Sequence, residues 1–207
     1  MSPSEVVFDE MQIDFIKEIF NTGLGEAGVE LSELVEDEVE LSVPDFQLLS
    51  REVIYQRLGI DKDTLVNSVA VTIGGDISGN GILVFPEANS LGLIRTIVEE
   101  AAGPDAMTDQ EEEALVEISG IILNNLISTI SEFLSMDITT DLPHHFKDTL
   151  ASILAQPDDG GVIMFVGMSF SVKSLNLSGD ILFLQNTETT QKFYQRVAKT
   201  LDEYDLD

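Results

Sequence analysis

The sequence predicts an α+β fold, in which a largely antiparallel sheet carries two long helices and several shorter ones. Three observations lead to this prediction: two long stretches with apolar residues at helical spacing, two pairs of β-rich runs, and the same order of elements in both halves of the chain. With 207 residues, of which 43% are hydrophobic, the chain is long enough to bury a core.

The first long helix is expected to run from about Met11 to the acidic stretch at 36–38. Its apolar residues would form a stripe that faces the core: Phe15, Ile16, Ile19, Phe20, Leu24, Ala27, Leu31 and Leu34. Gly23, Gly25 and Gly28 would each weaken a helix by about 1 kcal/mol relative to Ala. Their presence predicts that another helix or a partner packs closely against this stretch.

The remaining elements are expected in the following order. In the first half these are a shorter helix at 45–58 after Pro44, strands at 66–73 and 81–85 joined by a hairpin turn, and a helix at 87–102 that Gly103-Pro104 ends. In the second half they are a long helix from a capping box at Thr108–Glu111 to about Met136, Pro143, a short helix around 146–154, a turn at 157–161, strands at 162–172 and 176–184, and a helix at 188–201.

A single offset relates the two halves. Pro44 and Pro143 are 99 positions apart, and the same offset places the strand Ile82–Phe85 on Ile181–Leu184. We therefore predict a tandem duplication with pseudo-two-fold symmetry. The chain would be one domain over residues 1–207, made of repeats at about 9–107 and 108–207.

Composition excludes several classes of partner. The net charge of −28, from 38 acidic and 10 basic side chains, should repel nucleic acid and anionic lipid. No run approaches the ~20 consecutive apolar residues of a membrane-spanning helix, and the first residues lack the basic start and apolar run of a signal peptide. The chain has no cysteine. These features favour a cytoplasmic protein without membrane insertion.

Polar residues of the first helix form the candidate site. Asp14, Glu18 and Asn21 are separated by four and three positions, so they should share one outward face. A carboxamide can accept a hydrogen bond from water and donate one to an oxyanion, and a carboxylate one turn earlier can bind a cation of a partner. Gly25, one turn beyond Asn21, would leave room for a partner's backbone. Exposed Asp, Glu and Asn residues on an outer helix face usually contact only solvent. The distant Pro44 and the repeat favour a functional role for Asp14, Glu18 and Asn21.

The pattern Asp14-x3-Glu18-x2-Asn21-x22-Pro44 resembles the motif of the CheC/CheX/FliY group of chemotaxis phosphatases. The duplicated layout extends this resemblance over nearly the whole chain. It implies a phosphatase that hydrolyses the aspartyl phosphate of a response-regulator receiver domain in two-component signalling. By resemblance, Asn21 would hold the attacking water in line and Glu18 would pair with the receiver's lysine. The receiver would supply the Mg²⁺, so this chain would bind no metal and no cofactor.

The second copy departs from the motif. Glu113, Glu117 and Pro143 match, but Gly120 stands at the asparagine position and has no side chain to orient water. Asn124 shares the Glu117 face but lies ~6 Å farther along the helix axis. We therefore predict one working site, in the first half. Whether the second face binds a receiver or another partner without hydrolysis stays open.

Two other functions compete with the phosphatase. The chain could be a non-catalytic module that docks a receiver or a flagellar-switch subunit, or an adaptor that uses the Gly120 face. Asn21 favours the enzyme, because a docking module needs no water-orienting amide. His144 and His145 are adjacent and predict no metal site, and the glycine-rich stretch at 74–81 lacks the lysine of a P-loop. Self-association into a homodimer stays open.

Overall fold

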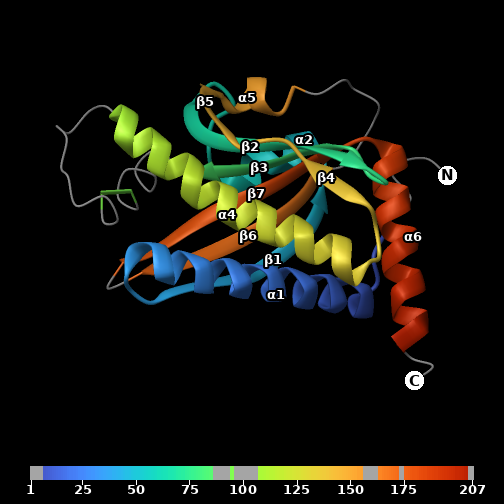
Figure 1. Cartoon of the computed structure of the whole chain (residues 1–207). Helices are drawn as coiled ribbons and strands as arrows, with labels where there is room; N and C mark the ends of the chain where they lie inside the picture. Colours follow the sequence, from blue (N-terminus) through green and yellow to red (C-terminus); the bar gives the residue numbers. More distant parts are fainter. Residues whose placement is uncertain (1–6, 86–93, 96–106, 156–162, 173–174, 205–207) are drawn as a thin grey trace.

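Two long helices lie side by side on one face of a seven-stranded sheet, and a third stands across their end (Figure 1). The computed structural model describes residues 7–85, 94–95, 107–155, 163–172 and 175–204. The helices are α1 (Glu10–Val35), α2 (Arg51–Leu58), α4 (Asp109–Phe133), α5 (Leu150–Ile153) and α6 (Thr187–Tyr204). The strands are β1 (Val39–Leu49), β2 (Leu65–Gly75), β3 (Gly79–Phe85), β4 (Ile138–Thr140), β5 (His144–Thr149), β6 (Ile163–Val172) and β7 (Leu175–Gln185).

The sheet is antiparallel throughout its described pairs, and the halves of the chain are interleaved in it. The strand order is β1-β6-β7-β3-β2-β4, with β5 also paired to β2. The outer strand β1 thus pairs with a strand of the second half, and β4 and β5 pair with a strand of the first. Both long helices begin with a capping box, at Asp9 and at Thr108, which are 99 positions apart. These correspondences support the predicted duplication and its repeat limits, which stay a prediction.

Apolar side chains cover both faces of the sheet. One cluster lies between the sheet and the helices α1, α4 and α6, and it includes Ile16, Phe20, Leu24, Leu123, Leu126, Phe183 and Phe193. The other cluster lies between the opposite face and the short helices α2 and α5, and it includes Ile54, Val84, Leu150, Phe165 and Leu182. The α+β class and the antiparallel sheet with two long helices are therefore confirmed.

Two of the three glycines in α1 are sites of close packing. A Cβ on Gly23 would lie 2.9 Å from Thr129 Oγ1 of α4, and one on Gly28 would lie 3.1 Å from the Val39 carbonyl oxygen. A Cβ on Gly25 would meet no atom within 4 Å. The close approach predicted for this stretch is thus confirmed at the first two positions, while Gly25 faces open space.

The predictions for the segments around the two prolines were wrong in part. Residues 45–49 continue strand β1, and only Arg51–Leu58 of the predicted helix is helical. Likewise, residues 144–149 form β5, and the predicted helix is confined to Leu150–Ile153. Both segments are extended because they pair with remote strands, β6 and β2 respectively. A proline is tolerated in β1 because β1 is an edge strand.

The other predicted strands and the three long helices are confirmed within a few residues. In the β2–β3 turn, Gly75 has a φ of 102°, and the Asp137 carbonyl approaches it so closely that no side chain would fit. The predicted helix at 87–102 lies outside the described residues apart from Ile94 and Arg95. The predicted turn at 157–161 also lies outside them.

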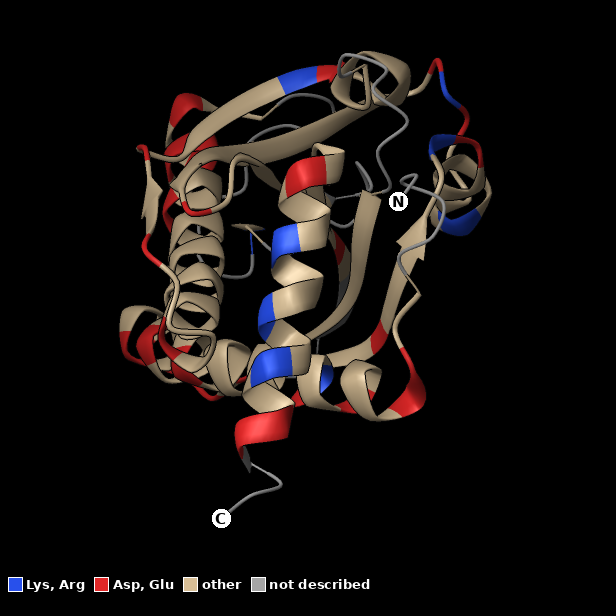
Figure 2. Cartoon of the chain, turned by 90° about the vertical axis from the view of Figure 1, so that its right-hand side faces the viewer, with Lys and Arg blue, Asp and Glu red and all other residues tan. Residues whose placement is uncertain are grey.

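Helix α4 is long and apolar enough to cross a membrane by length and composition alone. However, 56% of its most apolar window is buried inside the protein, so it is accounted for as a core helix. The outer face of α6 carries three of the ten basic side chains, Lys192, Arg196 and Lys199 (Figure 2). By contrast, α1 and α4 have acidic residues in their first turns and no basic residue in their last turns.

Candidate functional site on helix α1

The candidate site occupies one face of α1. The helix begins at a capping box in which the Asp9 side chain accepts from the Gln12 N–H and the Gln12 side chain accepts from the Asp9 N–H. Asp14 and Glu18 are exposed, as their spacing predicts, and Asn21 is half-buried. The two carboxylates therefore face solvent, while the carboxamide lies nearer to the protein than the sequence suggests.

Asn21 is fixed by strand β1. Its Oδ1 accepts a hydrogen bond of 2.9 Å from the backbone N–H of Val43, the residue before Pro44. At this point β1 contains a bulge, because Ser42 pairs with Ser169 and Asp45 with Gly167, so two residues stand opposite one. The 22-residue spacing between Asn21 and Pro44 thus corresponds to a direct contact between helix and strand.

Charged groups beside this bulge were not singled out from the sequence. Asp45 lies 2.7 Å from Arg57 Nη2, and Arg57 also lies 4.8 Å above the ring of Phe165. Burial acts to raise the pKa of Asp45, but hydrogen bonds from Arg57 and Gln47 and the nearby charges of Arg57 and Lys17 hold it below its usual value. Lys17 of α1 is therefore close enough to Asp45 for its charge to lower the pKa of that carboxyl group.

Asp180 lies two strands away from Asp45, since both residues pair with strand β6 at Gly167. Burial raises the pKa of Asp180 to about 6; the Arg57 charge lowers this pKa, and the Asp45 charge raises it. Asp180 and Asp45 both lie on the sheet face opposite to α1, so these two carboxyl groups belong to the structure of the sheet and not to the exposed face of α1.

The corresponding place in the second half is closed. Pro143 lies over Gly120, where an added Cβ would be 2.8 Å from the proline Cγ. The residue before this proline, Leu142, is 87% exposed, whereas Val43 is 6% exposed. No side chain at 120 can bond to the strand, and the strand is interrupted between β4 and β5.

The other predicted residues of this half lie on the outer face of α4. Glu113, Glu117 and Asn124 are exposed. Beside Asn124 is an open hollow of about 700 Å³, which is also lined by Ser128, Asp141, Leu142 and Pro143. Asn125 turns toward α1 and donates to Glu30 at 2.9 Å. The second half therefore presents acids but no carboxamide at the place where Asn21 stands in the first.

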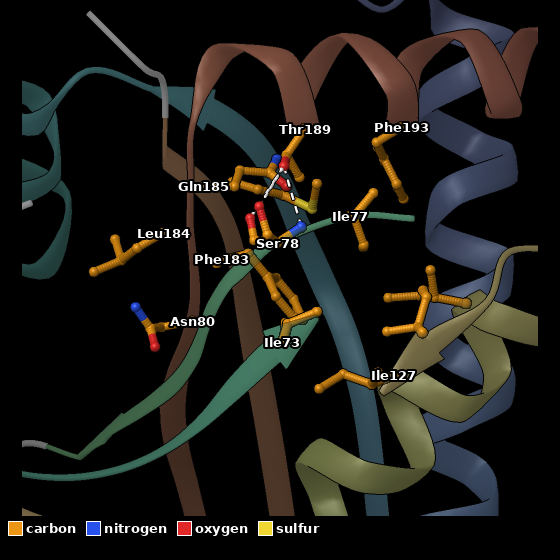
Figure 3. Close-up of a pocket in the computed structure, with 14 residues that line it drawn as sticks. Ile73, Ile77, Ser78, Asn80, Ile127, Phe183, Leu184, Gln185, Thr189 and Phe193 are labelled. Carbon is orange, nitrogen blue, oxygen red and sulfur yellow. Dashed lines mark hydrogen bonds between the residues drawn. The ribbon is translucent and has the colours of Figure 1, made fainter. Parts of the chain in front are cut away.

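A small, partly open apolar pocket lies elsewhere, beneath α6 (Figure 3). It has a volume of about 20 Å³, which is room for about one water molecule. At its edge Thr189 bonds to the backbone of Ser78. None of the predicted site residues lines it. Among the described residues there is no group of three metal-ligating side chains, and His145 is bonded to Glu112 and Asn67.

Comparison with known proteins finds relatives by sequence and by fold. No family model matches the chain. It is 22% identical over 153 residues to the CheY-P phosphatase CheC of Bacillus subtilis, an alignment that covers 71% of each chain. It also superposes on FliY of Thermotoga maritima with a TM-score of 0.74 and 15% identity, covering 94% of this chain and all of the other.

The fold is that of the CheC/CheX/FliY group. The resemblance predicted from the motif is thus confirmed. FliM in the FliG–FliM complex of H. pylori has the same fold, with a TM-score of 0.67, 13% identity, and coverage of 91% of this chain and all of the other. CheX in the CheX–CheY–BeF3–Mg²⁺ complex of Borrelia burgdorferi gives a TM-score of 0.51 with 16% identity, covering 84% and 99%.

Proposed function

We propose that this CheC-like chain is a phosphatase that hydrolyses the aspartyl phosphate of a response-regulator receiver domain. The observation that carries the proposal is the carboxamide of Asn21, held by strand β1 beside the exposed Glu18 and the open space over Gly25. The similarity to a CheY-P phosphatase, and the fold shared with a CheX that was crystallised with CheY, support it.

The chemistry suits such a site. An acyl phosphate is a reactive anhydride, so its hydrolysis requires positioning of water more than a strong base. Asn21 is uncharged and can approach the phosphoryl group without the repulsion that a carboxylate would meet. Glu18, one turn earlier, would form a charge-assisted bond with the receiver's lysine. The Mg²⁺ would be held by the receiver, and the reaction would take place in the cytoplasm.

The deciding experiment follows the decay of phosphorylated receiver domains from the same organism. Wild-type protein should accelerate the decay, and Asn21→Ala should lose about 10²–10³ of that acceleration, as expected for the loss of one transition-state contact. Glu33→Gln, on an exposed part of α1 beyond the site, is the matched control and should retain full activity. Full activity in Asn21→Ala would contradict the assignment.

A second function is favoured by one observation. FliM in the FliG–FliM complex shares the fold, so this architecture also occurs in a protein crystallised with a different partner. A non-catalytic docking module would bind a receiver or a flagellar-switch subunit without changing the decay. Binding of a receiver by the wild type without faster decay, in a titration with every available receiver, would support this alternative.

A further inference from the structure

We infer that the Val43–Pro44 bulge of strand β1 is a positioning element that holds the Asn21 carboxamide with its NH2 group directed toward the partner. This inference rests on the proposed function for its catalytic consequence. The contact itself is a property of the fold, so it can be tested whether or not the protein proves to be a phosphatase.

The first step is the hydrogen bond. Val43 N–H donates to Asn21 Oδ1, so the oxygen end of the carboxamide is turned toward the strand. The Nδ2 atom has no partner among the residues that the structure describes, and it is not one of the buried polar atoms left without a partner. It is therefore open to solvent, with two N–H donors available to a ligand.

The second step is the bulge that frees the Val43 N–H. In a regular edge strand, this group would either bond to the neighbouring strand or face solvent. Here the register shifts between Ser42 and Asp45, and Pro44 has no N–H with which to restore regular pairing. The proline thus favours the local conformation in which Val43 donates to the helix.

The second half of the chain provides an internal comparison. Gly120 has no side chain that could accept a hydrogen bond. The residue before Pro143, Leu142, points outward and is 87% exposed. The strand there is divided into β4 and β5, whereas β1 runs continuously past Pro44. A proline alone is therefore not enough to produce a bulged, continuous strand. In the half that has such a strand, the helix also carries an asparagine that accepts from it.

The inference also refines the chemistry at Asn21. One lone pair of Oδ1 is occupied by Val43, so the NH2 group is the principal contact that Asn21 offers to the receiver. N–H donors suit the negative charge on phosphoryl oxygens, and they can hold the attacking water by its oxygen. A carboxylate at position 21 would keep the bond to Val43 but could not make these contacts.

The test combines kinetics with NMR of the full chain. Pro44→Ala should lower kcat for a phosphorylated receiver by about tenfold or more, because small misplacements of a catalytic group are costly, while KM stays within about twofold. Pro143→Ala is the matched control and should leave both constants unchanged, since Pro143 contacts Gly120. An unchanged kcat in a folded Pro44→Ala protein would overturn the positioning role.

The second readout does not depend on activity. Hydrogen exchange of the Val43 amide should be slow in the wild type and in Asn21→Asp, which retains the acceptor, and at least tenfold faster in Asn21→Ala. Equal exchange in the wild type and Asn21→Ala would overturn the contact. If the wild type accelerates no receiver while Val43 responds as expected, the proposed function fails and the positioning contact stands.

Discussion

Pro143 packs directly on Gly120, so that a Cβ at position 120 would lie 2.8 Å from the proline Cγ. The glycine at the asparagine position of the second half is therefore required by its surroundings. An amide side chain at this place would have to displace the proline ring.

We therefore expect that Gly120→Asn does not create a second site. In the Asn21→Ala background it should restore no phosphatase activity, because its amide has neither space nor a strand N–H to bind. Forced overpacking of this kind typically lowers the free energy of unfolding by about 1–3 kcal/mol. Denaturant unfolding and receiver decay would measure both effects, and recovered activity would contradict the prediction.

Alanine substitutions at two glycines of α1 should change the stability of the protein in opposite directions. Gly23→Ala should destabilise the protein by about 1–3 kcal/mol, because its Cβ would meet Thr129 and the backbone of Leu126 at 2.9 and 3.0 Å. Gly25→Ala should stabilise it by up to about 1 kcal/mol, because Ala favours the helix and nothing lies within 4 Å. Urea denaturation of the two variants measures the difference. If both changed stability in the same direction, the packing of α1 on α4 would be wrong.

The partly buried Asp180 should make the stability of the protein depend on pH. Its pKa of about 6 in the folded protein lies above its usual value of 3.8, so its favourable contribution is complete below pH 3.8 and is lost as the pH rises through 6. Asp180→Asn cannot ionise, and it should gain up to about 3 kcal/mol over the wild type at pH 7.5, from 1.36 kcal/mol per pKa unit.

Urea unfolding at pH 4, 5, 6 and 7.5 separates this effect from the other titrating groups. The gain of Asp180→Asn should fall to about 0.5 kcal/mol at pH 4. Asp202→Asn, an exposed carboxyl group on α6, is the control and should show no such trend. An equal gain for Asp180→Asn at pH 4 and 7.5 would mean that its ionisation is not responsible.

Removing the charge of Glu18 should weaken the docking of the receiver domain. Glu18→Gln removes a charge but keeps the shape of the side chain, so it should raise KM for the phosphorylated receiver by about 10–100-fold while kcat stays nearly constant. Salt should also affect the variant less than the wild type, because exposed charges are screened. A lower kcat with unchanged KM would assign Glu18 to the chemical step instead.

Much of the fold follows from local patterns. The apolar stripes of α1 and α4, the capping box at Thr108 and the glycine-rich β2–β3 turn are short-range signals, and the structure confirms them except at Leu34, which was predicted to face the core but is 43% exposed near the end of α1. The segments after the two prolines were misread because their extended form depends on pairing with strands more than 70 residues away. No local signal separates such an edge strand from a short amphipathic helix.

By itself, the sequence determined the motif and its repeated layout, because residue spacing on a helix sets which side chains share a face. Only the tertiary structure decided how these residues can act. It brings Val43 to Asn21 and Pro143 to Gly120, so one copy holds a carboxamide with an open NH2 group while the other is closed. The first contact joins a helix to a strand and the second joins a helix to the gap between β4 and β5, each over about twenty residues, and their geometry depends on packing across the whole sheet.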